Sequence, residues 1–131
     1  MQVVVRIALI VTLVLGLTDC YSIIAVPDMA TAAVYGPNVP IRSLSPQQVA
    51  QLSSWMKAHD AGWRYLMGVP LAPITVRIVV REPNSQQIRF DLFEFKDRTA
   101  VMYFYAPSPA RPLKRYLSET DFATLWEAVR D

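Results

Sequence analysis

The chain has 131 residues, of which 53% are hydrophobic, and its 13 Lys and Arg nearly balance its 11 Asp and Glu. Nucleic-acid-binding proteins carry clustered basic surface, so a net charge of +2 argues against nucleic acid as the partner. The single cysteine excludes an intrachain disulfide. Ten prolines and only four glycines indicate stiff connections, and the length suits one domain.

Residues 1–19 have the layout of a secretory signal peptide. Arg6 is the only charge before Asp19, and an apolar run extends between them from Ile7 to Leu17. This run is shorter than the roughly 20 residues that a membrane-spanning helix needs. Extending it would place Asp19 in the bilayer, at a cost of about 2.5–3.5 kcal/mol near a helix centre. Export with cleavage is therefore the first interpretation, and an uncleaved anchor is the second.

The end of the apolar run, Leu17-Thr18-Asp19-Cys20, resembles the lipobox of bacterial lipoproteins. In that family the signal is cut before the cysteine, whose thiol carries diacylglycerol and whose amine is acylated. The resemblance implies a lipid on Cys20 that attaches the protein to a membrane, although the family has a small neutral residue where this chain has Asp19. Tyr21 follows the cysteine in place of the aspartate that can signal inner-membrane retention. The resemblance thus implies an outer-membrane location facing the periplasm if the host is Gram-negative.

Two alternatives for Cys20 stay open beside the lipid anchor. It is an ordinary residue if the signal is discarded whole or retained. It is a reactive thiol if its surroundings favour the thiolate, but neither a histidine nor a basic residue is adjacent to it in the sequence.

Residues 20–44 are expected to form the lipidated cysteine and a tether, because three prolines and Gly36 interrupt any regular element. The folded domain is then expected over residues 45–131. Its first helix is predicted to begin at Ser45, which is followed by a proline and by a glutamine three residues on, as in a capping box. Gly62 is a suitable residue to end this helix, because glycine commonly follows the last turn of a helix.

Three strands joined by short turns are predicted next, over residues 74–81, 87–95 and 99–106. The first alternates between apolar and polar residues. The second changes phase in its middle, which a bulge or burial of both faces would explain. The third is apolar almost throughout, which is typical of a strand covered on both faces. We expect the first strand to be an edge, with Arg77 and Arg81 as outward charges that hinder self-pairing.

A proline-rich crossing loop is expected after the strands, and a final helix is predicted from Ser118. The helix carries apolar residues at i, i+3, i+4 and i+7, namely Phe122, Leu125, Trp126 and Val129. The predicted fold class is therefore α+β, with the order helix, three-stranded antiparallel meander, helix. The simplest architecture is a two-layer sandwich with both helices on one face of the sheet.

The sequence contains no constellation typical of catalysis, metal binding or nucleotide binding. His59 is the single histidine, no histidine–cysteine cluster is present, and neither GxxxxGK nor GxGxxG occurs. Asp60 could orient His59 as a base, but side chains on one helix seldom converge around a substrate. We therefore expect no catalytic residue, no metal, no cofactor and no enzyme activity.

Candidate partner-binding residues come from two segments rich in the residue types that anchor protein interfaces. They are Trp63, Arg64, Tyr65, Arg111, Lys114, Arg115 and Tyr116. The alternative is that the aromatic residues fill the core and the basic residues lie on a solvated loop. If the basic residues do have a function, they would meet an acidic partner or anionic headgroups.

These patterns predict an exported, membrane-tethered envelope lipoprotein that acts as a protein-interaction module. An accessory subunit of an envelope machine and an inhibitor or immunity protein fit equally well. The alternatives are an exported small-ligand-binding protein, a minor enzyme that uses His59, and a purely structural envelope protein that self-associates at a strand edge.

Overall fold

The computed structural model describes residues 21–68, 70, 73–107 and 112–130. The lipidation candidate Cys20, the predicted signal and Arg111 lie outside these residues. The described elements are, in chain order, β1 (Thr31–Gly36), β2 (Val39–Ser43), α2 (Pro46–Ala58), β3 (Arg64–Tyr65), β4 (Val76–Arg81), β5 (Gln87–Glu94), β6 (Ala100–Tyr105), β7 (Leu113–Leu117) and α3 (Glu119–Val129).

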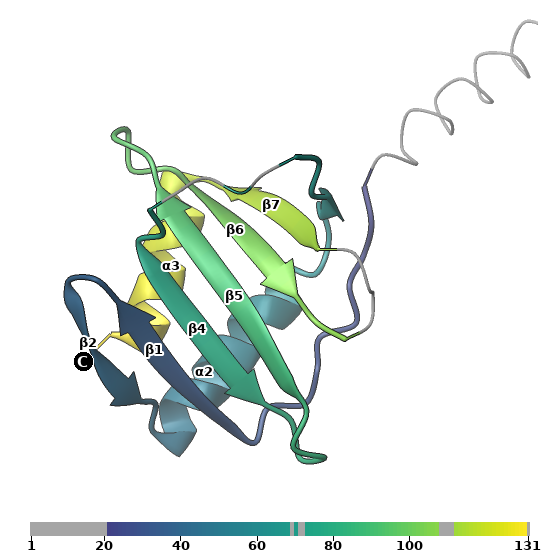
Figure 1. The fold of residues 1–131 in the computed structure, drawn as a ribbon, viewed down its shortest axis with the longest axis vertical. Coiled ribbons are helices and arrows are strands. Elements are labelled where there is room, and N and C mark those ends of the chain that lie inside the picture. The colour runs from purple at the N-terminus through teal and green to yellow at the C-terminus, as the bar shows by residue number, and fades with distance from the viewer. Residues whose placement is uncertain (1–20, 69, 71–72, 108–111, 131) are drawn as a thin grey trace, which may run out of the picture.

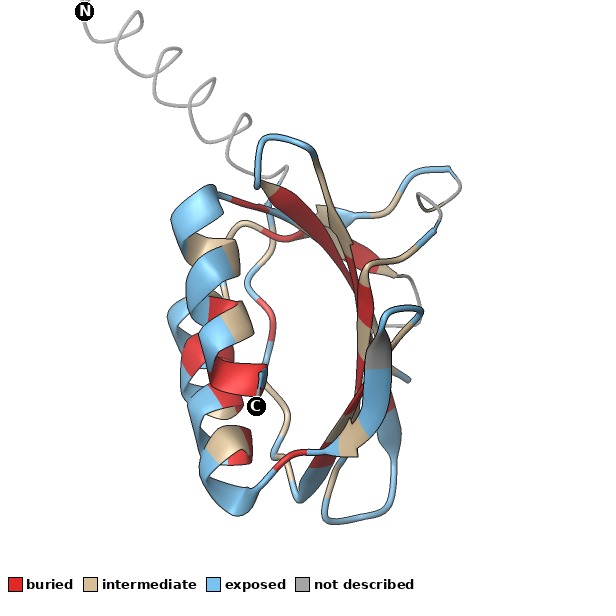
Figure 2. Cartoon of the chain, turned by 90° about the vertical axis from the view of Figure 1, so that its left-hand side faces the viewer, coloured by how far each residue is buried: buried red, intermediate tan, exposed pale blue. Residues whose placement is uncertain are grey.

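The strands form one seven-stranded sheet with the order β2-β1-β4-β5-β6-β7-β3, and every neighbouring pair is antiparallel. Figure 1 shows α2 and α3 behind this sheet, and Figure 2 shows that both lie on the same side of it. The sheet therefore has an inner face, which the helices cover, and an outer face, which they leave uncovered. Among the described residues, no helix is long and apolar enough to cross a membrane.

The inner face carries the apolar core. Alternate residues of the central strands point toward the helices, because successive side chains of a strand face opposite sides. Ile78, Phe90 and Met102 on three neighbouring strands are completely buried, as are Leu52 and Met56 on α2. This core holds the helices against one face of the sheet and leaves the other free for different chemistry.

Both helices begin where their caps predict. Ser45 accepts a hydrogen bond from the backbone N–H of Gln48, whose side chain accepts one from the Ser45 N–H in return. Ser118 accepts a hydrogen bond from the backbone N–H of Asp121. The helices run antiparallel, since Gln48 near the start of α2 donates to the carbonyl of Arg130 after the end of α3.

The α+β class holds, but the predicted three-stranded meander is wrong. The three predicted strands correspond to β4, β5 and β6, and four further strands extend the sheet on both sides of them. β4 is not an edge, because β1 pairs with it from Thr31 to Tyr35. The edges are β2 and β3, so Arg77 and Arg81 lie on an interior strand.

Three segments without a predicted helix or strand form these additional strands. Residues 31–43, which were expected to belong to a tether, form the β1–β2 hairpin. The expected crossing loop contains β7, so Lys114, Arg115 and Tyr116 belong to a strand instead of a loop. The segment after α2, around Trp63-Arg64-Tyr65, supplies the short edge strand β3, which pairs with β7.

The phase change in β5 accompanies partial burial of its outer face, where Asp91 is buried and Phe93 is partly buried. The pairing of β5 with β4 and with β6 runs without a register shift, so no bulge is present there. Val101 and Tyr103 on the outer face of β6 are buried, alongside the inward-facing Met102 and Phe104. This double burial agrees with the continuous apolar pattern of that strand.

Candidate functional site

Four of the predicted partner-binding residues lie together at the β3–β7 edge of the sheet. We call this edge the aromatic–basic patch, and its residues are Tyr21, Ile23, Arg64, Tyr65, Lys114 and Tyr116. Tyr65 follows Arg64 in β3 and lies opposite the buried Leu113, so its side chain points to the other side of the edge, where it borders a hollow with Ile23. Arg64 lies directly opposite Lys114 in the β3–β7 pair, so both side chains point to the same face. An isolated bridge between Ser22 and Trp63 holds the first described residues beside this edge.

Cation–aromatic contacts join the members of the patch. The guanidinium carbon of Arg64 lies 5.1 Å from the ring centre of Tyr21 and 5.5 Å from that of Tyr116. The ammonium of Lys114 also lies 5.5 Å from the Tyr116 ring. These distances are within the range of cation–π attraction. Both tyrosines remain 53% exposed, so the contacts arrange a surface without closing it.

Two of the predicted partner-binding residues have structural contacts instead. Trp63 has no exposed surface; its indole N–H donates to the carbonyl of His59 at 2.9 Å and its ring meets Phe104 edge-on. Arg115 points to the inner face, where its Nε donates to the carbonyl of Ala61 at 2.8 Å. The prediction of a partner-binding role therefore does not fit Trp63, which is part of the core.

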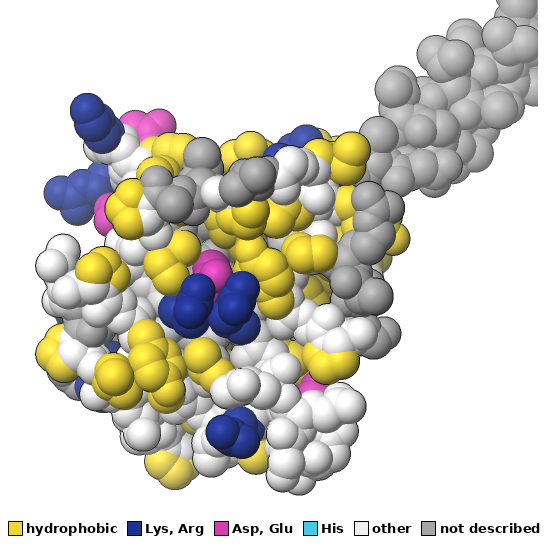
Figure 3. All heavy atoms as spheres, viewed as in Figure 1, with side chains coloured by type: hydrophobic (Ala, Val, Ile, Leu, Met, Phe, Trp, Pro, Cys, Tyr) yellow, Lys and Arg dark blue, Asp and Glu magenta, His cyan; other side chains and the backbone are white. Residues whose placement is uncertain are grey.

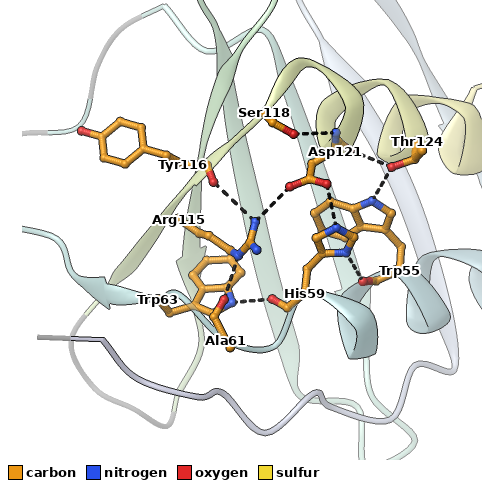
Figure 4. A network of polar contacts seen from close by, with 9 residues as sticks. All are labelled: Trp55, His59, Ala61, Trp63, Arg115, Tyr116, Ser118, Asp121 and Thr124. Atoms are coloured by element: carbon orange, nitrogen blue, oxygen red, sulfur yellow. Dashed lines mark hydrogen bonds and ion pairs between the residues drawn. The ribbon is translucent and has the colours of Figure 1, made fainter. Parts of the chain in front are cut away.

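Arg115 takes part in a polar network that connects the two helices to β7 (Figure 4). Its Nη1 lies 3.7 Å from Oδ2 of Asp121 on α3, while Nε2 of His59 lies 3.2 Å from Oδ1 of the same carboxylate. Burial raises the pKa of Asp121, but the hydrogen bond and charge of His59, the charge of Arg115 and the bond with Ser118 outweigh it. The pKa of Asp121 is therefore lower than its ordinary value.

His59 forms the centre of this network. It is the C-cap of α2, and its Nδ1 lies 2.7 Å from the carbonyl oxygen of Trp55 one turn earlier. Its ring stacks on the Trp55 indole with centroids 3.9 Å apart, and that indole donates to Thr124 on α3. Both imidazole nitrogens thus face acceptors, a carbonyl and a carboxylate, and the side chain is 16% exposed. This arrangement connects α2 to α3 and directs neither nitrogen toward a substrate.

A second polar group lies on the outer face, away from the patch. We call Arg77, Arg89 and Asp91 the arginine cluster. Arg77 makes two contacts with the carboxylate of Asp91, at 2.8 and 3.2 Å, and Nε of Arg89 lies 3.3 Å from its Oδ2. The hydrogen bond that Arg77 donates to Asp91 raises the pKa of Arg77 above its ordinary value. Figure 3 shows two basic side chains around one acidic side chain in the middle of this face, among hydrophobic neighbours.

The arginine cluster has more positive than negative charge and borders a hollow. Asp91 is only 4% exposed, whereas each arginine side chain is 39% exposed. The guanidinium of Arg89 lies 4.1 Å from the ring centre of Tyr105. A hollow of about 430 Å³ is lined by both arginines, Tyr105, Val79, Gln87, Ile88, Ala106 and Pro107. Two cations share one carboxylate here, so the hollow favours a negatively charged group.

The sequence did not reveal this cluster as a site. Arg89 and Asp91 alternate with the core residues of β5. This pair of opposite charges within an apolar strand is the feature of the sequence that could have indicated the cluster. The third member comes from β4, where Arg77 is opposite Asp91 in the register. Only the strand pairing brings the three side chains together.

Within the described part of the chain, no group of three or more His, Cys, Asp or Glu side chains is arranged to hold a metal ion. No family model matches the chain, and no curated protein or solved structure is significantly similar to it.

Proposed function

We propose that this chain is an exported bacterial envelope protein, tethered to a membrane through its N-terminal segment, whose domain binds another protein. The tether is supported by the apolar run and the lipobox-like residues that end at Cys20. The binding role is supported by a sheet that the helices cover on one face only. An accessory subunit and an inhibitor would both use such a surface.

The arginine cluster is the observation that carries the binding role. Arginine and tyrosine are enriched among the residues that dominate interface energetics. The cluster places two partly exposed guanidinium groups and Tyr105 around one hollow, with positive charge in excess. Guanidinium groups bind carboxylates with paired, charge-assisted hydrogen bonds. The proposed partner therefore presents an acidic side chain to this hollow.

Binding is favoured over catalysis by the contacts of His59. A catalytic role requires a nitrogen within hydrogen-bonding distance of a substrate. Both of its nitrogens already have protein partners, and the ring is stacked on Trp55. The small-ligand alternative would be favoured by a closed cavity shared by Trp55 and Phe104, but these residues border two different open hollows.

The tether is tested by Cys20→Ser in the full chain, followed by fractionation of cells into membranes and soluble material. If Cys20 carries the lipid, the variant moves into the soluble fraction. Membrane association equal to that of the parent would contradict lipidation and favour an uncleaved anchor.

The binding surface is tested by affinity capture from membranes with quantitative mass spectrometry. Arg89→Ala should lower the yield of the partner about tenfold or more, as expected for loss of a central charged contact. Arg81→Ala is the matched control, because this exposed arginine lies on the same face near the far end of β4. Equal partner yields from Arg89→Ala and the parent would contradict the proposed surface.

A further inference from the structure

We infer that the aromatic–basic patch is a docking surface for anionic lipid headgroups. This deepens the proposed function, since it rests on the tether for its orientation and assigns that edge of the sheet to the membrane. A protein partner at the same surface is the competing occupant, which the experiment below distinguishes.

The composition of the patch is that of a membrane–water interface. Tyrosine is enriched at the headgroup level, and basic residues with nearby apolar side chains are typical of segments that lie on anionic bilayers. Tyr21 and Tyr116 are each 53% exposed, and Tyr65 is 48% exposed. Ile23 is 75% exposed, and together with Tyr65 it borders a hollow of about 300 Å³. The patch thus combines rings, an aliphatic side chain and cations on one edge.

The cations of the patch differ from those of the arginine cluster in the groups that they contact. Among the described residues, neither Arg64 nor Lys114 forms an ion pair with a carboxylate, and both lie against tyrosine rings instead. The arginine cluster differs, because Asp91 neutralises part of its charge. Two cations that no described carboxylate neutralises attract a phosphate-bearing bilayer, and this attraction does not depend on one complementary side chain.

The position of the patch provides the second argument. Tyr21 is the residue after Cys20, and the Cα atoms of consecutive residues are about 3.8 Å apart. A lipid on Cys20 therefore holds Tyr21 at the bilayer surface, together with the residues that it contacts. The other edge of the sheet, β2, is then directed away from the membrane, because it lies at the opposite end of the strand order. The arginine cluster, on the middle strands, stays accessible to a partner.

The experiment uses the chain from residue 21 to residue 131, which lacks the signal and Cys20. Every buried residue of the described core lies between Ile24 and Val129, so this form keeps the whole core. Cosedimentation is measured with vesicles of phosphatidylcholine alone and of phosphatidylcholine mixed with phosphatidylglycerol. Binding is expected only to the anionic vesicles, and it should fall as salt is raised because headgroup attraction is screened.

The double variant Arg64→Gln/Lys114→Gln should reduce partitioning onto anionic vesicles by roughly tenfold or more, as expected for removal of two cations. Lys57→Gln removes an exposed charge from α2 and is the matched control, with partitioning like the parent. Equal binding to neutral and anionic vesicles, or an equal loss in the control, would overturn the inference.

A parent chain that binds neither kind of vesicle overturns the inference without recourse to any variant. If the double variant keeps vesicle binding but loses partner capture, the patch binds protein instead. Because this form contains no Cys20, a failure to bind vesicles would not contradict lipidation of Cys20. Likewise, a Cys20→Ser variant that stays in the membrane fraction would not contradict vesicle binding by the patch.

Discussion

The two faces of the sheet are built by the same strands but have different chemistry. On the inner face, the buried residues of β4, β5 and β6 belong to the apolar core that packs beneath α2 and α3. On the outer face, the same strands present the arginine cluster, Tyr105 and a hollow. The inner face therefore forms the apolar core, while the outer face carries a charged cluster that is not part of that core.

Two phenylalanines of β5 test this division with the largest expected effect. Phe90 on the inner face has no exposed surface and stacks on Phe104 at 5.1 Å, so Phe90→Ala should lower the free energy of unfolding by about 3–5 kcal/mol. Phe93 on the outer face is only partly buried, and Phe93→Ala should cost clearly less. Denaturant unfolding measures both, and equal costs would break the distinction between the faces.

Asp91 tests whether the outer face contributes to stability at all. Asp91→Asn keeps the shape but removes the charge that Arg77 and Arg89 share, so we expect a loss of about 1–3 kcal/mol in the free energy of unfolding. The matched control is Asp28→Asn, on an exposed position in a connecting segment. If Asp91→Asn loses no more stability than Asp28→Asn, water solvates Arg77 and Arg89 as well as the Asp91 carboxylate does.

The inner face was predictable from the sequence to a greater extent than the outer face. Caps at Ser45 and Ser118 and the alternation in residues 74–81 are local patterns, and they gave both helices and the central strands. β1 was missed because its sequence is short, contains two alanines, ends in Gly36 and is followed by Pro37, all of which are poor strand signals. Its partner β4 is more than forty residues away in the sequence.

The candidate sites were predictable only in part, for the same reason. Arg64, Tyr65, Lys114 and Tyr116 could be identified by residue type, but their proximity depends on the pairing of β3 with β7. Residue type also suggested Trp63 as an exposed anchor, although large rings dominate cores as well as interfaces. The burial of a particular ring is decided by packing, which the local sequence does not show.

The network behind β7 provides a pH-dependent prediction of moderate size. The pKa of Asp121 in the folded chain is lower than its ordinary value of 3.8, so the folded state favours the carboxylate. Its stabilising contribution is complete above that ordinary value and is lost as the pH falls through the lower folded-state pKa. Asp121→Asn should therefore cost about 1 kcal/mol at neutral pH.

The measurement compares the free energies of unfolding of Asp121→Asn and the parent between neutral pH and pH about 3. The difference should shrink as the pH falls below about 4, because the parent then loses the same carboxylate charge. Asn at this position keeps the backbone N–H that donates a hydrogen bond to the Ser118 hydroxyl, so the helix cap is preserved. A difference that does not change with pH would show that the negative charge of Asp121 adds no stability through His59 and Arg115.

The smallest effect on stability is expected at the aromatic–basic patch. Arg64 contacts the rings of Tyr21 and Tyr116 at a surface that stays open, so Arg64→Ala should change the free energy of unfolding by no more than about 0.5 kcal/mol. The same substitution should weaken binding to anionic vesicles severalfold. Trp63→Ala, one residue earlier, is the contrasting variant, with an expected cost of about 3–5 kcal/mol because that ring is completely buried. A large loss of stability in Arg64→Ala would show that the patch maintains the sheet edge, and its exposure would then be incidental.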